Sequence, residues 1–141
     1  MPLAYVDTNV FVYALLKSTR KLLPHEINVK ESAKQIVSRI NGGEEVACSV
    51  VHFSEICNII EYYLPLEVAL IFEKGLLLRE NIQILEVTPD DYLNAVSISE
   101  QHSVGLNDAL AYLLMKKTAI TSIYSFDKHF DCFPEIKRVT E

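Results

Sequence analysis

Four acidic residues stand where their side chains could act together: Asp7, Glu55, Asp108 and Asp127. If they gather at one place, each carboxylate disfavours ionisation of its neighbours unless a cation lies between them. A ligand set made only of oxygen atoms suits Mg²⁺ or Mn²⁺. The four residues are therefore candidate ligands of a divalent metal ion.

Helix capping is the alternative explanation for these residues. Asp7, Asp108 and Asp127 come before segments with helical patterns, where Asp is a favoured cap or first-turn residue. Glu55, near the start of a predicted helix, would gain a little from the helix dipole. Capping explains Asp7 least well, because Asp7 directly follows an apolar run and precedes the polar pair Thr8-Asn9.

Short apolar runs alternate with helical patterns along the whole chain. The predicted strands are residues 3–6, 46–51, 82–87, 120–125 and 136–139. The predicted helices are 8–16, 31–40, 66–79, 89–101 and 108–117. A further helix, with Ile56, Ile59, Ile60 and Tyr63 on one face, follows the second strand and ends at Pro65. Most of the strands are apolar throughout, which is typical of a parallel sheet covered on both faces. We therefore expect an α/β fold, a three-layer α/β/α sandwich with a mainly parallel central sheet, formed by residues 1–141 as a single domain.

Residues 17–30, which include Pro24, form a polar stretch between two predicted helices. Its composition predicts a connection, and the most mobile part of the chain.

The strand directions place three of the four carboxylates together. Ligands of open parallel sheets bind beyond the carboxyl ends of the strands. Asp7, Glu55 and Asp127 each follow shortly after a predicted strand, so they share one edge of the sheet. Asp108 has no strand before it and opens a helix after the turn at Gly105.

The charge of the chain limits how it could bind nucleic acid. The 13 Lys and Arg against 19 Asp and Glu give a formal net charge of −6, and the pI is near 5.2. Bulk attraction to phosphates is therefore unfavourable, and a divalent metal would offset the negative charge.

The remaining chemistry-bearing residues favour no other class. Cys48, Cys57 and Cys132 lack CxxC spacing and are interpreted as reduced, apolar filler residues. The four histidines show no HxH or HExxH spacing, so we expect His52 and His129 to flank a site at most and no zinc centre. GxGxxG, GxxxxGK[ST] and GxSxG motifs are absent. With no signal-peptide pattern and no long uncharged apolar run, a cytoplasmic protein without membrane contact is expected.

Four segments resemble the acidic motifs of PIN domains, a family of metal-dependent ribonucleases that includes toxins of the VapBC type. They are Val6-Asp7-Thr8-Asn9-Val10, Phe53-Ser54-Glu55-Ile56, Gly105-Leu106-Asn107-Asp108-Ala109 and Ser125-Phe126-Asp127-Lys128-His129-Phe130. Each motif alone is weak, but four in this order, spanning essentially the whole chain, are much more specific.

The resemblance implies an endoribonuclease that uses Mg²⁺ or Mn²⁺. Asp7 and Asp108 match direct metal ligands, and Glu55 and Asp127 match ligands or water-positioning bases. Asn9 and Ser125 match polar positions beside the acidic quartet. The basic residues Lys17, Arg20, Lys21 and Lys128 could hold the RNA backbone, although an ordinary solvated loop explains them equally well.

Two further functions remain open from the sequence. A phospho-acceptor receiver module would also have an acidic Mg²⁺ pocket, but it needs paired acids at the first strand. A PIN-like scaffold without activity would serve only as a binding partner.

The toxin subset of the family implies a small antitoxin partner and a homodimer. The predicted helix 66–79 carries apolar residues on more faces than one buried stripe needs. This surplus indicates either a dimer surface, which we favour, or deeper burial of the helix in the domain.

Overall fold

A parallel five-stranded sheet forms the centre of the molecule. The computed structural model describes residues 3–15 and 20–141. Its strands lie in the order β3-β2-β1-β4-β5, and every pairing is parallel. In chain order the elements are β1 (Ala4–Val6), α1 (Thr8–Leu15), α2 (Pro24–Asn41), β2 (Val46–Ser49), α3 (Val50–Tyr63), α4 (Leu66–Leu78), β3 (Ile82–Leu85), α5 (Pro89–His102), α6 (Leu106–Lys117), β4 (Ser122–Tyr124), the 3-10 helix η1 (Lys128–Cys132) and β5 (Lys137–Val139). The predicted α/β class is confirmed.

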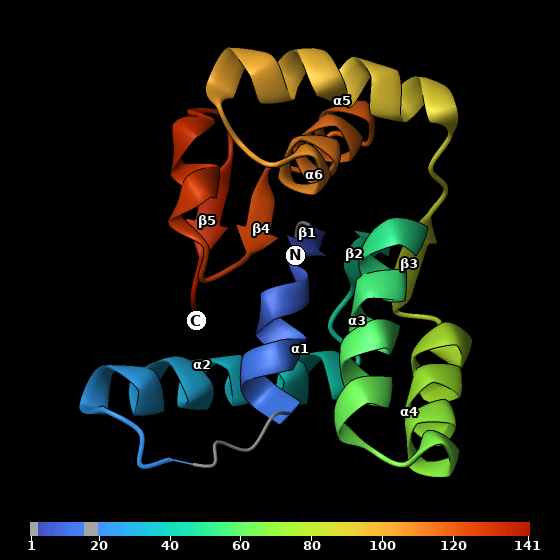
Figure 1. The fold of residues 1–141 in the computed structure, drawn as a ribbon, viewed down its shortest axis with the longest axis vertical. Helices are drawn as coiled ribbons and strands as arrows, with labels where there is room; N and C mark the ends of the chain where they lie inside the picture. The colour runs from blue at the N-terminus through green and yellow to red at the C-terminus, as the bar shows by residue number, and fades with distance from the viewer. Residues whose placement is uncertain (1–2, 16–19) are drawn as a thin grey trace.

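Helices cover both faces of the sheet, as the apolar strands require. Tyr5 of β1 packs on one face, in a core with residues of α5, α6 and η1. Its neighbours Ala4 and Val6 pack on the other face, in a core with residues of α1, α2, α3 and α4. This alternation follows from the two-residue period of a strand. Figure 1 shows the resulting three layers, with α5 and α6 above the sheet and α1 and α2 below it.

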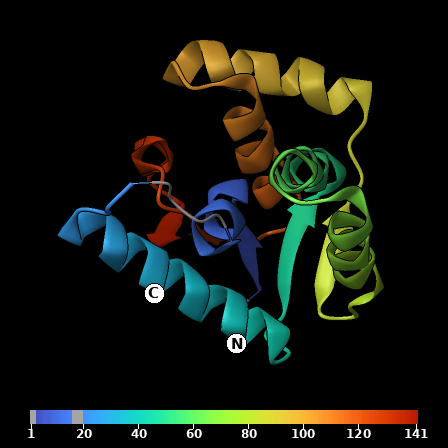
Figure 2. The same ribbon diagram turned by 60° about the horizontal axis from the view of Figure 1, so that its bottom comes forward.

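Helix α2 begins earlier than predicted and lies against α1 (Figure 2). Pro24 occupies its first turn, where a missing N–H costs nothing. Glu26 accepts a hydrogen bond from the backbone N–H of Leu23 at 3.2 Å and pairs with Arg20 at 2.6 Å. The prediction of a polar connection over 17–30 is therefore wrong from residue 24 onward, and residues 17–19 lie outside the described part of the chain.

Strand β2 ends at Ser49, two residues before the predicted end, because Ser49 starts the next helix. Its Oγ accepts a hydrogen bond from the backbone N–H of His52 at 3.1 Å and so caps α3. Helix α6 likewise begins at Leu106, before Asp108. Ser49 and His52 thus lie at the start of α3, and Asp108 lies in the first turn of α6.

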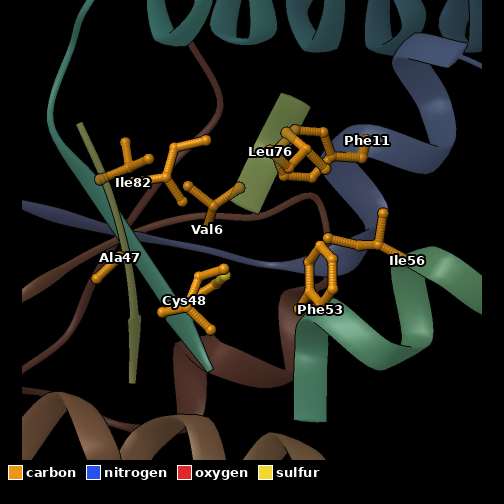
Figure 3. Close-up of a pocket in the computed structure, with 10 residues that line it drawn as sticks. Val6, Phe11, Ala47, Cys48, Phe53, Ile56, Leu76 and Ile82 are labelled. Atoms are coloured by element: carbon orange, nitrogen blue, oxygen red, sulfur yellow. The ribbon is translucent and has the colours of Figure 1, made fainter. Parts of the chain in front are cut away.

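The core below the sheet contains a small apolar cavity of about 10 Å³ (Figure 3). Its lining includes Val6, Phe11, Phe53 and Leu76, together with the Cys48 thiol. Nothing in this lining could bind a charged substrate, so the cavity is a packing void of the core.

Helix α4 buries Ala69, Glu73 and Leu76 and exposes much of its apolar surface. Its exposed apolar residues are Leu66, Val68, Leu70, Ile71, Leu77 and Leu78, which lie next to exposed Tyr62, Tyr63 and Leu64. The surplus of apolar residues noted in the sequence therefore lies at the surface. Within residues 3–15 and 20–141, no helix has the length and apolar character needed to cross a membrane.

Candidate metal centre

The first two site residues meet where β1 and β4 end. The parallel pairing of Val6 with Tyr124 brings the next residues, Asp7 and Ser125, side by side. The buried Ser125 hydroxyl donates to Oδ2 of Asp7 at 2.6 Å and accepts from the backbone N–H of Asp127 at 3.0 Å. One side chain thus fixes the positions of two predicted metal ligands.

Asp127 and Asp108 approach each other around His129. The Nδ1 atom of His129 lies 3.0 Å from Oδ1 of Asp127 and 3.9 Å from Oδ2 of Asp108. One ligand atom from each of the three residues lies within 4.8 Å of the other two. Asp108 belongs to α6, Asp127 caps η1, and His129 lies in η1. These three side chains could contribute to one metal site.

Glu55 reaches the same region from the second turn of α3. Its Oε1 accepts a hydrogen bond from Nδ2 of Asn107 at 2.8 Å, and Oδ1 of Asn107 accepts one from the Tyr92 hydroxyl at 3.1 Å. Asn107 directly precedes Asp108 on α6. The contact therefore ties Glu55 to the helix that carries another of the predicted ligands.

The four carboxylates influence one another electrostatically. The pKa of Asp7 is raised to about 6, mainly by burial and also by the charges of Asp108, Asp127 and Glu55, against the lowering effect of the Ser125 hydrogen bond. Burial also raises the pKa of Asp108, with Asp127 and Glu55 adding to the effect and His129 opposing it. All four predicted acids thus converge from separate segments of the chain. Their oxygen donors and mutual repulsion fit a hard divalent cation.

Capping accounts for Asp127 but not for the other acids. Oδ1 of Asp127 accepts a hydrogen bond from the backbone N–H of His129 at 2.9 Å, at the start of η1. The Asp7 side chain bonds instead to Ser125, across the sheet. Asp108 lies inside the first turn of α6, whose cap position is Gly105.

A buried polar network lies beneath the carboxylates and is centred on His52. Nε2 of His52 lies 3.3 Å from the backbone carbonyl of Asn107, which can only accept, so this nitrogen carries the proton. Nδ1 is then an acceptor, and the hydroxyls of Tyr5 and Ser49 lie 2.7 and 2.6 Å from it. Burial lowers the pKa of His52, consistent with this neutral form. His52 thus joins β1, β2 and α3 to the first turn of α6.

A pocket of about 320 Å³ lies beside α1 and α2, and none of the four acids lines it. It is lined by Tyr13, His25, Asn28, Val29, Ser32, Phe126, Lys128, Arg138 and Thr140. The exposed Lys128 follows Asp127 directly, and Arg138 is held by Asp131 at 2.9 Å. Lys128 and Arg138 therefore give part of the pocket wall a positive charge.

The other predicted polar and basic residues have mixed placements. Oδ1 of Asn9 accepts from the backbone N–H of Phe126 at 3.4 Å, so Asn9 also lies at the junction of β1 and β4. Arg20 pairs with Glu26, and the exposed Lys21 follows it before α2. Lys17 lies outside the described residues.

His52 and His129 flank the site, as the sequence predicts, but their partners are not apparent from residue type and spacing, and Asn107 is not predicted at all. Asn107 holds Glu55, His129 contacts two of the acids, and His52 contacts the backbone carbonyl of Asn107. The positions of Asn107 beside Asp108 and of His129 two residues after Asp127 are the only signals in the sequence, and neither specifies a partner.

Several solved structures share the fold of this chain. VapC20 of Mycobacterium tuberculosis, described as a toxin that cleaves the sarcin-ricin loop, has a TM-score of 0.69 at 19% identity, with 91% of this chain and 92% of that chain covered. A toxin-antitoxin complex from Klebsiella pneumoniae has a TM-score of 0.67 at 14% identity, with 98% of each chain covered. VapBC2 of Rickettsia felis, bound to a DNA fragment from its promoter, gives 0.64 at 15% identity, with 97% of each covered. At these identities the likeness shows the fold.

The sequence matches none of the curated proteins with which it was compared. The family model for the PIN domain matches residues 4–136, nearly the whole chain. The match includes all four acids that converge at the edge of the sheet, and the chain belongs to the PIN domain family.

Proposed function

We propose that this protein is an endoribonuclease that uses Mg²⁺ or Mn²⁺ to hydrolyse RNA phosphodiester bonds. The observation that carries the proposal is the convergence of Asp7, Glu55, Asp108 and Asp127. Burial is the main cause that raises the pKa of Asp7 to about 6, and the charges of the other three acids contribute to this rise. Such a cluster is costly in the metal-free protein and becomes favourable once a divalent cation neutralises it.

Asp7 and Asp108 are the proposed direct ligands, with Asp127 completing the set. A divalent ion bound there supplies charge neutralisation at the scissile phosphate and makes a water molecule more acidic. Ser125 holds the Asp7 carboxylate in place, and Asn107 holds that of Glu55. Glu55 can then orient the attacking water and accept its proton.

The basic residues that line the pocket beside α1 and α2 would hold the RNA strand near these carboxylates. We propose that Lys128, next to Asp127, neutralises a phosphate close to the cleaved bond, and that Arg138 contributes at the far side of the pocket. Arg20 and Lys21, with Lys17, would contact the backbone farther along. Local basic groups of this kind compensate for the net charge of −6.

The exposed apolar face of α4 supports a protein partner. Ile71 is 75% and Leu78 is 70% exposed, on a helix whose opposite side is buried. Patches of this kind mark protein interfaces. We propose a second copy of this chain and a small antitoxin as partners. The antitoxin is suggested by the toxin-antitoxin complexes that share the fold, and the protein would then be the toxin of such a pair.

The two alternative functions have less support. A receiver module needs paired acids at its first strand, whereas β1 leads to Asp7 alone, followed by Thr8 and Asn9. An inactive scaffold would not need to keep four mutually repelling carboxylates together.

A circular RNA substrate tests the proposed activity. With Mn²⁺ or Mg²⁺ the protein should linearise the circle, which only an endonuclease can do. Excess EDTA should stop the reaction, and added metal should restore it. Cleavage that persists after chelation would contradict the metal dependence. An absence of cleavage with a mass increase of one phosphate after incubation with acetyl phosphate would favour the receiver module.

A further inference from the structure

A second cluster of metal-ligand side chains lies between α3 and α4, on different elements from the proposed catalytic acids. Cys57 and Glu61 stand one helical turn apart on α3, and Glu73 faces them from α4. One ligand atom from each residue lies within 4.8 Å of the other two. Figure 1 shows α3 and α4 side by side, joined by a short turn.

Glu73 is the unusual member of this cluster, because it is only 6% exposed. Within the described part of the chain, its Oε1 atom is buried and has no hydrogen-bond partner. A buried carboxylate oxygen without a partner is costly, and native proteins rarely leave one. Burial raises the pKa of Glu73, and the neighbouring Glu61 carboxyl group raises it further, whereas the Cys57 thiol lowers it.

We propose that Cys57, Glu61 and Glu73 form a Zn²⁺ site that joins α3 to α4. A cation would give the unpartnered Glu73 oxygen a ligand role and would neutralise the two adjacent carboxylates. The thiol of Cys57 decides which metal, since thiolates favour Zn²⁺ over Mg²⁺ or Mn²⁺. Three protein ligands leave a fourth position of a tetrahedral zinc ion for water.

This site does not depend on the proposed ribonuclease activity. It also revises the interpretation of Cys57 as an apolar filler residue, because Cys57 is half-buried beside two carboxylates. Its effect on the protein would be to hold the α3–α4 pair, which carries the exposed apolar face, in one arrangement.

Cobalt provides a direct probe, because Co²⁺ can take the place of Zn²⁺ and absorbs in the near ultraviolet when a thiolate is its ligand. Titration of the full-length protein with Co²⁺ should produce this band, and Zn²⁺ should abolish it. The Cys57→Ser variant should show no band. The Cys132→Ser variant should retain it, and it is the matched control because Cys132 is exposed and lies near Asp108.

The carboxylates are tested by Glu61→Gln and Glu73→Gln. Each should weaken Zn²⁺ binding by about tenfold or more. Zn²⁺ should raise the melting temperature of the wild type by at least about 3 °C more than it raises the melting temperature of either variant. Glu61 is exposed, so its variant is expected to fold even if Glu73→Gln does not.

Two results would overturn the proposal. If no thiolate band appears in the wild type, Glu73 is simply a protonated buried acid. If the band disappears in Cys132→Ser and persists in Cys57→Ser, the metal binds beside Asp108 instead.

Discussion

The Ser125 hydroxyl donates a hydrogen bond of 2.6 Å to Oδ2 of Asp7, although 118 positions separate the two residues. The bond joins the ends of neighbouring parallel strands at the edge of the sheet. Because the same Oγ accepts from the backbone N–H of Asp127, one buried hydroxyl positions acids from β1 and from the loop after β4.

Ser125→Ala should reduce the cleavage rate by about tenfold, the equivalent of one hydrogen bond to a charged group. The substitution removes a bond that lowers the pKa of Asp7 and leaves the Asp127 N–H without this acceptor. Single-turnover kinetics would measure the loss. Ser122→Ala on the same strand is the control and should cleave RNA as the wild type does. Equal rates for the two variants would show that Ser125 does not position Asp7.

The metal-free protein should lose stability as the pH rises from about 4 to about 6, because of Asp7. The pKa of Asp7 is about 6 in the folded protein and 3.8 in its ordinary state. Between these values the folded state binds more protons, so the free energy of unfolding falls with rising pH. The full penalty, reached above pH 6, is up to about 3 kcal/mol.

Asp7→Asn removes this penalty. In EDTA, urea denaturation should find the variant more stable than the wild type at pH 7.5, and this difference should nearly vanish at pH 4. Asp90→Asn, an exposed change at the start of α5, should show no such trend. A difference between wild type and Asp7→Asn that is equal at both pH values would contradict the electrostatic account.

Asp108→Asn should separate repulsion from metal binding. The metal-free variant should melt at or above the temperature of the wild type, because one of the repelling charges is gone. Mn²⁺ should raise the melting temperature of the wild type by several degrees, since it binds only the folded state, and that of the variant much less. Differential scanning fluorimetry measures both effects. An unchanged Mn²⁺ shift in the variant would remove Asp108 from the metal site.

His52→Phe should lower both stability and cleavage. The aromatic ring keeps the volume but leaves the Asn107 carbonyl, and the Tyr5 and Ser49 hydroxyls, without the imidazole. We expect the free energy of unfolding to fall by about 2–4 kcal/mol. The cleavage rate should fall about tenfold under conditions where the variant is fully folded, because Asn107 holds Glu55 and precedes Asp108.

His102→Phe is the control for His52→Phe, because the His102 ring packs against the aromatic rings of Tyr112 and Phe133. It should leave the cleavage rate unchanged. A His52→Phe variant that is less stable but cleaves at the wild-type rate would limit His52 to a structural role.

The sequence predicts the strands well, because apolar runs such as 3–6 have no other stable location than a covered sheet. It also predicts that Asp7, Glu55 and Asp127 share an edge, since parallel strands end on the same side. The strand order is not predictable in this way, because the hydrophobic pattern does not specify which strands are neighbours.

The start of α2 shows where a local rule misleads. Pro24 within a polar stretch predicts a connection, yet Pro in the first turn followed by an acid at Glu26 is also a helix-start pattern. The contacts of Asn107 and His52 could not be predicted at all, because they join elements far apart in the chain. Residue types indicate which side chains can bond but not which will meet.

The most direct test of the proposed metal-dependent site is the Mn²⁺-dependent cleavage rate of Asp7→Asn, measured beside the wild type and the Asp90→Asn control. Asn keeps the size of Asp7 and can still accept the Ser125 hydrogen bond, but it lacks the charge that holds a hard cation. We predict that Asp7→Asn cleaves at least about 100-fold more slowly, as expected for loss of a principal electrostatic group, and that Asp90→Asn matches the wild type. A folded Asp7→Asn protein that cleaves RNA at nearly the wild-type rate would contradict the proposal that these carboxylates form the catalytic centre.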